Sequence, residues 1–158
     1  MPNPSDHIPF TKVTHLMDVK NNTPQDISCA IIVREGMILA ANRGVNVSHS
    51  GEWEFPGGKP HANEDPRQCV VRRVQEELNL NINVLDAIKP YNITTPDKKS
   101  FRMHPFLAEI VGGKVEISHH NRVEWFLPMQ LMSLAWPDSD VPIIDELVGR
   151  IFRNGKIV

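Results

Sequence analysis

The chain has 158 residues, of which 41% are hydrophobic and 23% are charged, and these values fit one globular domain with a real core. Its formal net charge of −2 argues against a nucleic-acid coat protein or a polybasic membrane binder, but not against a small phosphorylated ligand. Cys29 and Cys69 cannot build a disulfide framework, so we expect two reduced core thiols. With no long apolar segment and no signal-peptide pattern, we expect a cytoplasmic protein that binds neither membrane nor nucleic-acid polymer.

The N-terminal part of the sequence predicts an extension followed by the first strands. Residues 1–24 are polar and interrupted by prolines, so we expect an N-terminal extension there and a single domain over residues 25–158. The apolar run at residues 27–33 predicts a buried central strand. After a turn, residues 37–41 predict a second strand.

A short strand, a loop and a helix are expected next. Residues 52–55 are typical of a short strand, whereas residues 56–60 hold two prolines and two glycines and predict an irregular loop without regular pairing. A helix is expected to begin at Pro66, with Asp65 as its N-cap, and to end at about Leu78.

The second half alternates strands with helices. Two longer strands are expected over residues 82–93 and 101–111, around a proline-containing turn. Shorter elements are expected as strands over 114–117 and 124–126 and as helices over 129–134 and 141–152. Strands and helices without a repeat or a linker predict an α/β fold.

The helix after the glycine loop carries an unusual set of charges. Arg72 and Glu76 are four residues apart, as are Arg73 and Glu77, so all four share roughly one side of the helix. Adjacent carboxylates repel each other unless a cation or an arginine compensates. Mg²⁺ prefers oxygen ligands, and a glycine backbone can approach a metal or a phosphate closely. These residues alone leave two interpretations open, a solvated face with ordinary Arg–Glu pairs or a site for a cation and a phosphate.

The wider pattern resembles the Nudix box, the signature of hydrolases that act on nucleoside diphosphates linked to another group. The matching positions keep the spacing of that box and are Gly58, Glu64, Arg72, Val74, Glu76, Glu77 and Leu80. Residues 53–59 also resemble the lead-in of the MutT-type and CTP-pyrophosphohydrolase-type branch, and the likeness covers about residues 27–152. The resemblance implies a Nudix-like α/β/α sandwich with a mixed sheet and the Nudix loop and helix.

Three positions depart from the pattern of that family. Asn79 replaces the closing glycine, a mild change because asparagine tolerates the left-handed conformation. Arg73 replaces a glutamate, and unit charges about 4 Å apart interact by roughly 4 kcal/mol at an effective dielectric near 20, so Mg²⁺ affinity should fall unless Arg73 turns away. His119, followed by His120, stands where an additional acidic ligand is often found. This pair is open to three interpretations: exposed side chains, ligands for Zn²⁺ or Mn²⁺, or a proton carrier.

The resemblance implies metal-dependent hydrolysis by attack of water on phosphorus. Glu76 and Glu77 would hold Mg²⁺ or Mn²⁺ with the carbonyl group of Gly57. Arg72 would orient the carboxylates, and Glu64 would support the loop or the metal ligands. The general base stays open, because the usual candidate position holds arginine.

The resemblance also suggests residues that bind the nucleotide. Arg43 matches the spacing of a nucleotide-contacting arginine, and Lys98 or the adjacent lysine could reach phosphate from the turn between the two longer strands. Phe55 could line a base pocket or belong to the core. Asp140 could read a base edge or cap the last helix. Glu54 is a candidate for the general base of the hydrolysis. The three tryptophans, Trp53, Trp125 and Trp136, are expected in the core.

The sequence therefore supports a pyrophosphohydrolase acting on a nucleoside triphosphate or another nucleoside diphosphate-linked substrate. The alternative is a nucleotide-binding or regulatory domain with weak or no catalysis, which Arg73 and His119 favour. A third reading is a structural domain whose loop is only a turn. The expected partner is a small-molecule nucleotide, and a homodimer stays open because the N-terminal extension could pack on a second copy.

Overall fold

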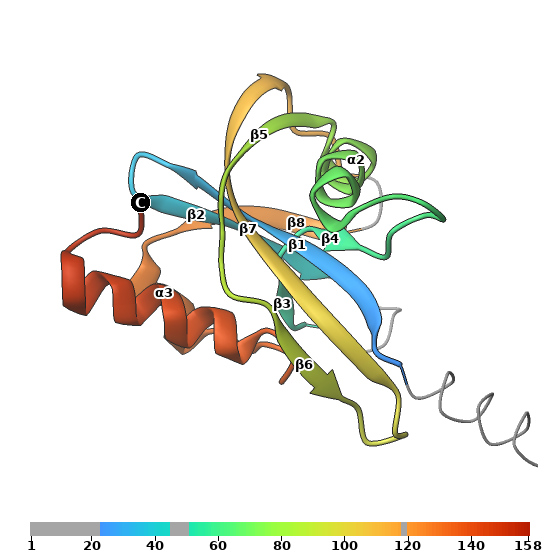
Figure 1. The fold of residues 1–158 in the computed structure, drawn as a ribbon. Helices are drawn as coiled ribbons and strands as arrows, with labels where there is room; N and C mark the ends of the chain where they lie inside the picture. The colour runs from blue at the N-terminus through green and yellow to red at the C-terminus, as the bar shows by residue number, and fades with distance from the viewer. Residues whose placement is uncertain (1–22, 45–50, 118–119) are drawn as a thin grey trace, which may run out of the picture.

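The described chain folds around one mixed sheet with a helix on each face (Figure 1). In this computed structural model, residues 23–44, 51–117 and 120–158 are described, so nearly all of the expected N-terminal extension lies outside them. The helices α2 (Pro66–Leu78) and α3 (Val141–Asn154) lie on opposite sides of the sheet. This arrangement confirms the predicted α/β/α sandwich with a mixed sheet.

The sheet is built around the strand predicted from the apolar run. β1 (Gln25–Arg34) pairs in parallel with β7 (Ser100–Gly113) and antiparallel with β2 (Met37–Arg43). The other strands pair with these three: β3 (Trp53–Glu54) and β8 (His120–Phe126) with β2, β5 (Leu80–Ala87) and β6 (Tyr91–Thr94) with β7, and β4 (Gly57–Gly58) with β1.

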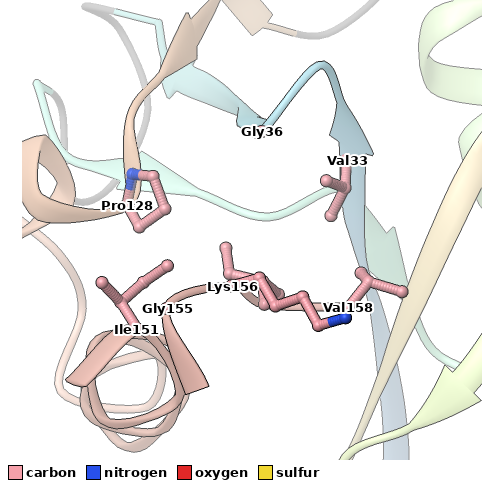
Figure 2. Close-up of a pocket in the computed structure, with 8 residues that line it drawn as sticks. Val33, Gly36, Pro128, Ile151, Gly155, Lys156 and Val158 are labelled. Atoms are coloured by element: carbon pink, nitrogen blue, oxygen red, sulfur yellow. The ribbon is translucent and has the colours of Figure 1, made fainter. Parts of the chain in front are cut away.

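The C-terminal elements close one edge of the molecule. A 3-10 helix, η2 (Pro128–Ser133), comes before α3, and the chain after Gly155 turns back toward the β1–β2 turn. A pocket of about 340 Å³ lies there, between Val33 on β1, Pro128, and Ile151 on α3 (Figure 2). Its lining is mainly apolar and includes none of the predicted site residues.

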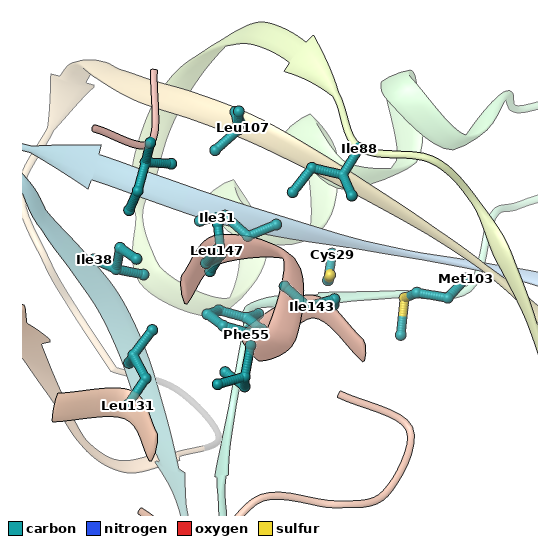
Figure 3. Packing of buried hydrophobic residues seen from close by; sticks show 12 residues of the cluster. Cys29, Ile31, Ile38, Phe55, Ile88, Met103, Leu107, Leu131, Ile143 and Leu147 are labelled. Carbon is teal, nitrogen blue, oxygen red and sulfur yellow. The ribbon is translucent and has the colours of Figure 1, made fainter. Parts of the chain in front are cut away.

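Both faces of β1 are buried, as expected of a central strand. Cys29 and Ile31 point to the α3 side, where the first core cluster forms (Figure 3). Ala30 and Ile32 point to the α2 side and join a second cluster with Val70 and other residues of α2. Alternate residues of a strand face opposite sides of the sheet, which explains why the sequence of β1 is a continuous apolar run. Cys29 and Cys69 are free and buried, as predicted.

The helix α2 has the ends that its sequence predicts. The Asp65 side chain accepts a hydrogen bond from the Gln68 backbone N–H (2.8 Å), and the Gln68 side chain accepts one in return from the Asp65 backbone (3.2 Å). Asn79 ends the helix in the left-handed conformation (φ 57°) and donates a side-chain hydrogen bond to the Lys114 carbonyl group. These caps fix the direction in which α2 presents its charged face.

Three expectations about local structure are wrong in detail. Residues 56–60 are not wholly irregular, because Gly57 and Gly58 pair with β1. The strand expected over residues 82–93 is divided into β5 and β6 around Pro90, which lacks the N–H that a ladder needs. Residues 114–117 form no strand, since β7 itself runs on to Gly113. The helical segment expected over 129–134 is present as the 3-10 helix η2, which begins and ends one residue earlier.

The described residues contain no helix with the length and apolar character needed to cross a membrane.

Candidate functional site

The glycine loop reaches the site because β4 lies unusually close to β1. A Cβ atom on Gly57 would collide with the carbonyl oxygen of Ser28, so only glycine allows this approach. The pairing of β4 with β1 brings the Gly57 carbonyl group and the start of the loop next to α2. The loop is held to the helix again where the thiol of Cys69 donates to the Gly58 carbonyl group (3.5 Å).

Arg72 is the centre of an ion-pair network between the loop and α2. Its Nε and Nη2 donate to the two carboxylate oxygens of Glu64 (2.8 and 2.9 Å), and Nη2 also donates to the Lys59 carbonyl group. Its Nη1 donates to both carboxylate oxygens of Glu76 (3.0 and 3.1 Å). These hydrogen bonds lower the pKa of Glu64 to about 2, and those from Arg72 and then Arg73 lower the pKa of Glu76. Both carboxylates are therefore ionised at neutral pH.

Arg73 does not turn away from the acidic end of the helix. Its Nη1 donates to Glu76 Oε2 (2.8 Å), and its Nη2 lies 3.0 Å from Glu77 Oε1. Its Nε donates to the Gly57 carbonyl oxygen (3.3 Å). The guanidinium therefore contacts all three groups that the sequence nominated as metal ligands.

Glu77 is the most buried of the three glutamates Glu64, Glu76 and Glu77. Its side chain is only 5% exposed, and its Oε1 accepts a hydrogen bond from the Gly57 backbone N–H (3.3 Å). A buried carboxylate needs a positive partner, which Arg73 provides here.

The donors at this position have the right chemistry for a hard divalent cation. The carboxylates of Glu76 and Glu77 and the carbonyl group of Gly57 are oxygen ligands of the kind that Mg²⁺ and Mn²⁺ prefer. In this structure the Arg73 guanidinium contacts the same three groups. Across the described ranges, no cluster of three or more histidine, cysteine, aspartate or glutamate side chains has a metal-holding arrangement. A metal here would thus depend on two carboxylates, a carbonyl group and further oxygens from a ligand.

An open pocket lies in front of these groups. Its volume is about 430 Å³, and its lining residues are Gly58, Lys59, His61, Arg72, Arg73 and Glu76. Its lining has three basic side chains and one acidic side chain, and it can offer N–H donors to an anion such as a phosphate group, although Arg72 and Arg73 are also ion-paired with glutamates.

A second pocket, of about 330 Å³, adjoins the first. Gly58 and Lys59 line both pockets, so the two pockets meet at this stretch of backbone. Arg43, Phe55 and Asp140 line the second pocket together, although they are far apart in the sequence. The structure thus gathers three of the four predicted substrate-binding residues.

Asp140 is buried in the wall of the second pocket. It is the N-cap residue of α3, as the sequence predicts, but its side chain makes no capping hydrogen bond. Burial, followed by repulsion from Glu54, raises its pKa to about 7, although a hydrogen bond from the Phe55 backbone and the charge of Arg43 act in the opposite direction. At neutral pH this carboxyl group is therefore present in both protonated and ionised forms.

The sequence profile of the NUDIX domain matches residues 23–147, which is most of the chain. The chain belongs to the NUDIX family. It is 27% identical over 120 residues to the CTP pyrophosphohydrolase of Escherichia coli K12, an alignment that covers 76% of this chain and 88% of that protein. It is 29% identical over 123 residues to the putative 8-oxo-dGTP diphosphatase 2 of Mycobacterium tuberculosis, with 73% and 82% covered.

Solved structures show the same fold. The solution structure of the E. coli ORF135 protein superposes with a TM-score of 0.70 at 24% identity, covering 82% of this chain and 92% of that one. The MutT protein of Methanosarcina mazei Go1 superposes with a TM-score of 0.69 at 24% identity, covering 84% and 96%. At these identities the likeness establishes the NUDIX fold.

The remaining predicted residues lie at different distances from the two pockets of this NUDIX chain. Glu54 lines the second pocket but is held by Arg43 (2.7 Å). Phe55 belongs to the core and also to that pocket, where it stacks on Trp136 with ring centroids 4.8 Å apart. Lys98 is exposed in the turn between β6 and β7, with a positive φ of 64°, and lines neither pocket.

The tryptophans follow the expectation in most respects. Trp53 is buried and meets Phe126 edge to face, and Trp125 is partly buried against the α2 cluster. Trp136 donates from its ring nitrogen to the Leu131 carbonyl group (2.8 Å). The prediction for His119 falls outside the described residues, as does the side chain of the following histidine.

Several residues that line the two pockets were not predicted as site residues from the sequence. Lys59 stands inside the lead-in to the Nudix box and Ser139 directly precedes Asp140, so both lay within recognised segments. Met103 reaches the second pocket because its strand pairs in parallel with β1, opposite Ile27. Only the sheet topology reveals that position.

Proposed function

We propose that this NUDIX chain is a pyrophosphohydrolase that acts on a nucleoside triphosphate or another nucleoside diphosphate-linked substrate. The observation that carries the proposal is the junction of the two pockets at Gly58 and Lys59. The first pocket, lined by Lys59, Arg72 and Arg73, suits the phosphates and is called the phosphate pocket. The second pocket is partly apolar, contains the buried Asp140, suits a nucleobase and is called the base pocket. A nucleotide that spans the junction would have its phosphoanhydride bonds beside Gly58.

The base pocket offers contacts suited to a nucleobase. Phe55 contributes an apolar wall, and Arg43 and Asp140 contribute polar groups. In its ionised form Asp140 accepts a hydrogen bond from an exocyclic amine, and in its protonated form it donates one to a ring nitrogen or carbonyl oxygen. Both forms exist near pH 7, so this position is compatible with a cytosine or a purine edge.

The phosphate pocket provides positively charged side chains and a loop that ion pairs hold in place. Lys59, Arg72 and Arg73 would neutralise phosphate oxygens, and the Arg72 bridge between Glu64 and Glu76 would hold the loop against α2 while the substrate binds. Mg²⁺ or Mn²⁺, held by Glu76, Glu77 and the Gly57 carbonyl group, would supply charge neutralisation and a more acidic water molecule. Glu54 remains a candidate proton acceptor that would have to exchange its bond with Arg43.

The test is turnover of a nucleotide panel with Mg²⁺ and then with Mn²⁺. CTP and 8-oxo-dGTP belong in it first, since similar proteins carry the names CTP pyrophosphohydrolase and 8-oxo-dGTP diphosphatase. We expect at least one nucleotide to yield a nucleoside monophosphate and pyrophosphate, or the equivalent product pair. Measurable binding without turnover of any nucleotide would contradict the enzyme and favour a nucleotide-binding domain, for which Arg73 at the carboxylates is the supporting observation.

A further inference from the structure

The guanidinium of Arg73 lies at the meeting point of three oxygen donors. Nε, Nη1 and Nη2 each face a different group: the Gly57 carbonyl oxygen at 3.3 Å, Glu76 at 2.8 Å and Glu77 at 3.0 Å. These are the same three groups that would coordinate a divalent cation. A planar guanidinium satisfies several acceptors at once, whereas a lysine ammonium would act as a compact point charge.

The surroundings hold this side chain in place. A Cβ atom on Gly58 would lie 2.5 Å from Arg73 Nε, so the space that the guanidinium fills exists because residue 58 has no side chain. Glu77 adds an electrostatic reason, since its nearly buried carboxylate would lose the ion pair with Arg73 if this side chain left.

A divalent ion and the guanidinium compete for these oxygens. Both are cations, and an ion that took Glu76 Oε2 and Glu77 Oε1 would have to displace the Arg73 nitrogens from these two oxygens. Arg73 also lines the basic pocket, so its positive charge faces the position proposed for the phosphates.

We infer that the guanidinium of Arg73 occupies the position of a divalent ion in the free protein. When a nucleotide binds, this guanidinium interacts directly with the diphosphate group of the nucleotide. The second half of this inference rests on the proposed function. It follows that the free chain binds divalent ions weakly, and that nucleotide binding does not require them.

The first test measures Mn²⁺ binding to the free, full-length chain by electron paramagnetic resonance, with no nucleotide present. Arg73→Glu should bind Mn²⁺ about tenfold or more tightly than the wild type, and Arg73→Gln should also gain affinity. Arg67→Glu is the matched control, because it makes the same charge change on an exposed position of α2 that lines neither pocket. It should behave as the wild type does.

Wild-type affinity for Mn²⁺ equal to that of Arg73→Glu would overturn the inference. So would an equal gain in Arg67→Glu, because the effect would then come from net charge alone. If Arg73→Glu fails to fold, Arg73→Gln carries the comparison, and a wild-type affinity equal to its own overturns the inference in the same way. Thermal unfolding gives a second readout: Mn²⁺ should raise the Tm of the variants at residue 73 but not that of the wild type.

The second test uses calorimetry with the α,β-methylene analogue of CTP, in EDTA and then in Mg²⁺. The wild type should bind with similar affinity in both buffers, whereas Arg73→Gln should bind about tenfold more weakly in EDTA. A wild type that binds only with Mg²⁺ would overturn the inference. Failure to bind this analogue and the corresponding 8-oxo-dGTP analogue in either buffer would contradict the proposed function, and the Mn²⁺ titration would then decide the role of Arg73 by itself.

Discussion

Replacement of Asp140 by asparagine should change how the stability of the protein depends on pH. Burial raises the pKa of this carboxyl group from 3.8 to about 7. The titratable groups that face it are Glu54, Glu52, Arg43, the thiol of Cys29 and the hydroxyl group of Tyr91. A group whose pKa is raised in the folded state stabilises that state at low pH. The contribution is complete below pH 3.8 and is lost as the pH rises through 7.

The size of the effect follows from the shift. About three pKa units at 1.36 kcal/mol each amount to about 4 kcal/mol, of which about 3 kcal/mol is lost between pH 5 and pH 8. Asparagine keeps the shape of the side chain but does not ionise in this range. The free energy of unfolding of Asp140→Asn, minus that of the wild type, should therefore rise by about 3 kcal/mol from pH 5 to pH 8.

Urea unfolding at four or five pH values measures this difference, and titrating groups that do not interact with Asp140 cancel when the two proteins are compared. Asp138→Asn is the matched control, because Asp138 is an exposed carboxylate in the same segment. Its difference from the wild type should stay flat. A flat difference for Asp140→Asn would refute the argument that burial holds a proton on this residue.

Three further outcomes follow from the loop and α2. Glu64→Gln should unfold more easily than the wild type at neutral pH, and the difference in the free energy of unfolding should shrink as the pH falls from 4.5 through about 2. The reason is that a carboxyl group with a lowered pKa stabilises the folded state only while it is ionised. Acid unfolding followed by circular dichroism measures this difference, and a difference that stays constant with pH would contradict the prediction. Gly57→Ala should cost about 3 kcal/mol or prevent folding, since its Cβ collides with Ser28, whereas Gly44→Ala has open space and should be nearly neutral in urea unfolding. Arg72→Lys loses the two-nitrogen fork on Glu64 and should lower kcat about 10- to 100-fold in steady-state kinetics; an unchanged kcat would show that this fork does not order the site.

Local chemistry made the helix of the site predictable. Asp65 before Pro66 predicts a helix start because an acidic side chain caps the free N–H groups and proline needs no partner there. Asn79 predicts the end because asparagine accepts the left-handed conformation. The four-residue spacing likewise predicted the pairing of Arg72 with Glu76. Each of these features depends on neighbours along the chain.

Contacts between distant segments were beyond such reasoning. Gly57 and Gly58 pair with β1 although a Pro-Gly-Gly-Lys-Pro sequence predicts a loop, because the absence of side chains permits a close approach that only the folded sheet creates. The approach of Arg73 to the Gly57 carbonyl group depends on that same pairing. Asp140 was predicted as a pocket residue only through the family resemblance, because β2, β4 and the start of α3 meet around it and local spacing does not encode that meeting.

The most direct test of the account is a crystal structure of the chain with the α,β-methylene analogue of the nucleotide that the panel selects. The account predicts the base beside Phe55 and Asp140 and the phosphates past Gly58 against Lys59 and Arg73. An analogue bound with its phosphates away from Arg73, or bound in the apolar pocket between β1 and the end of α3, would contradict it.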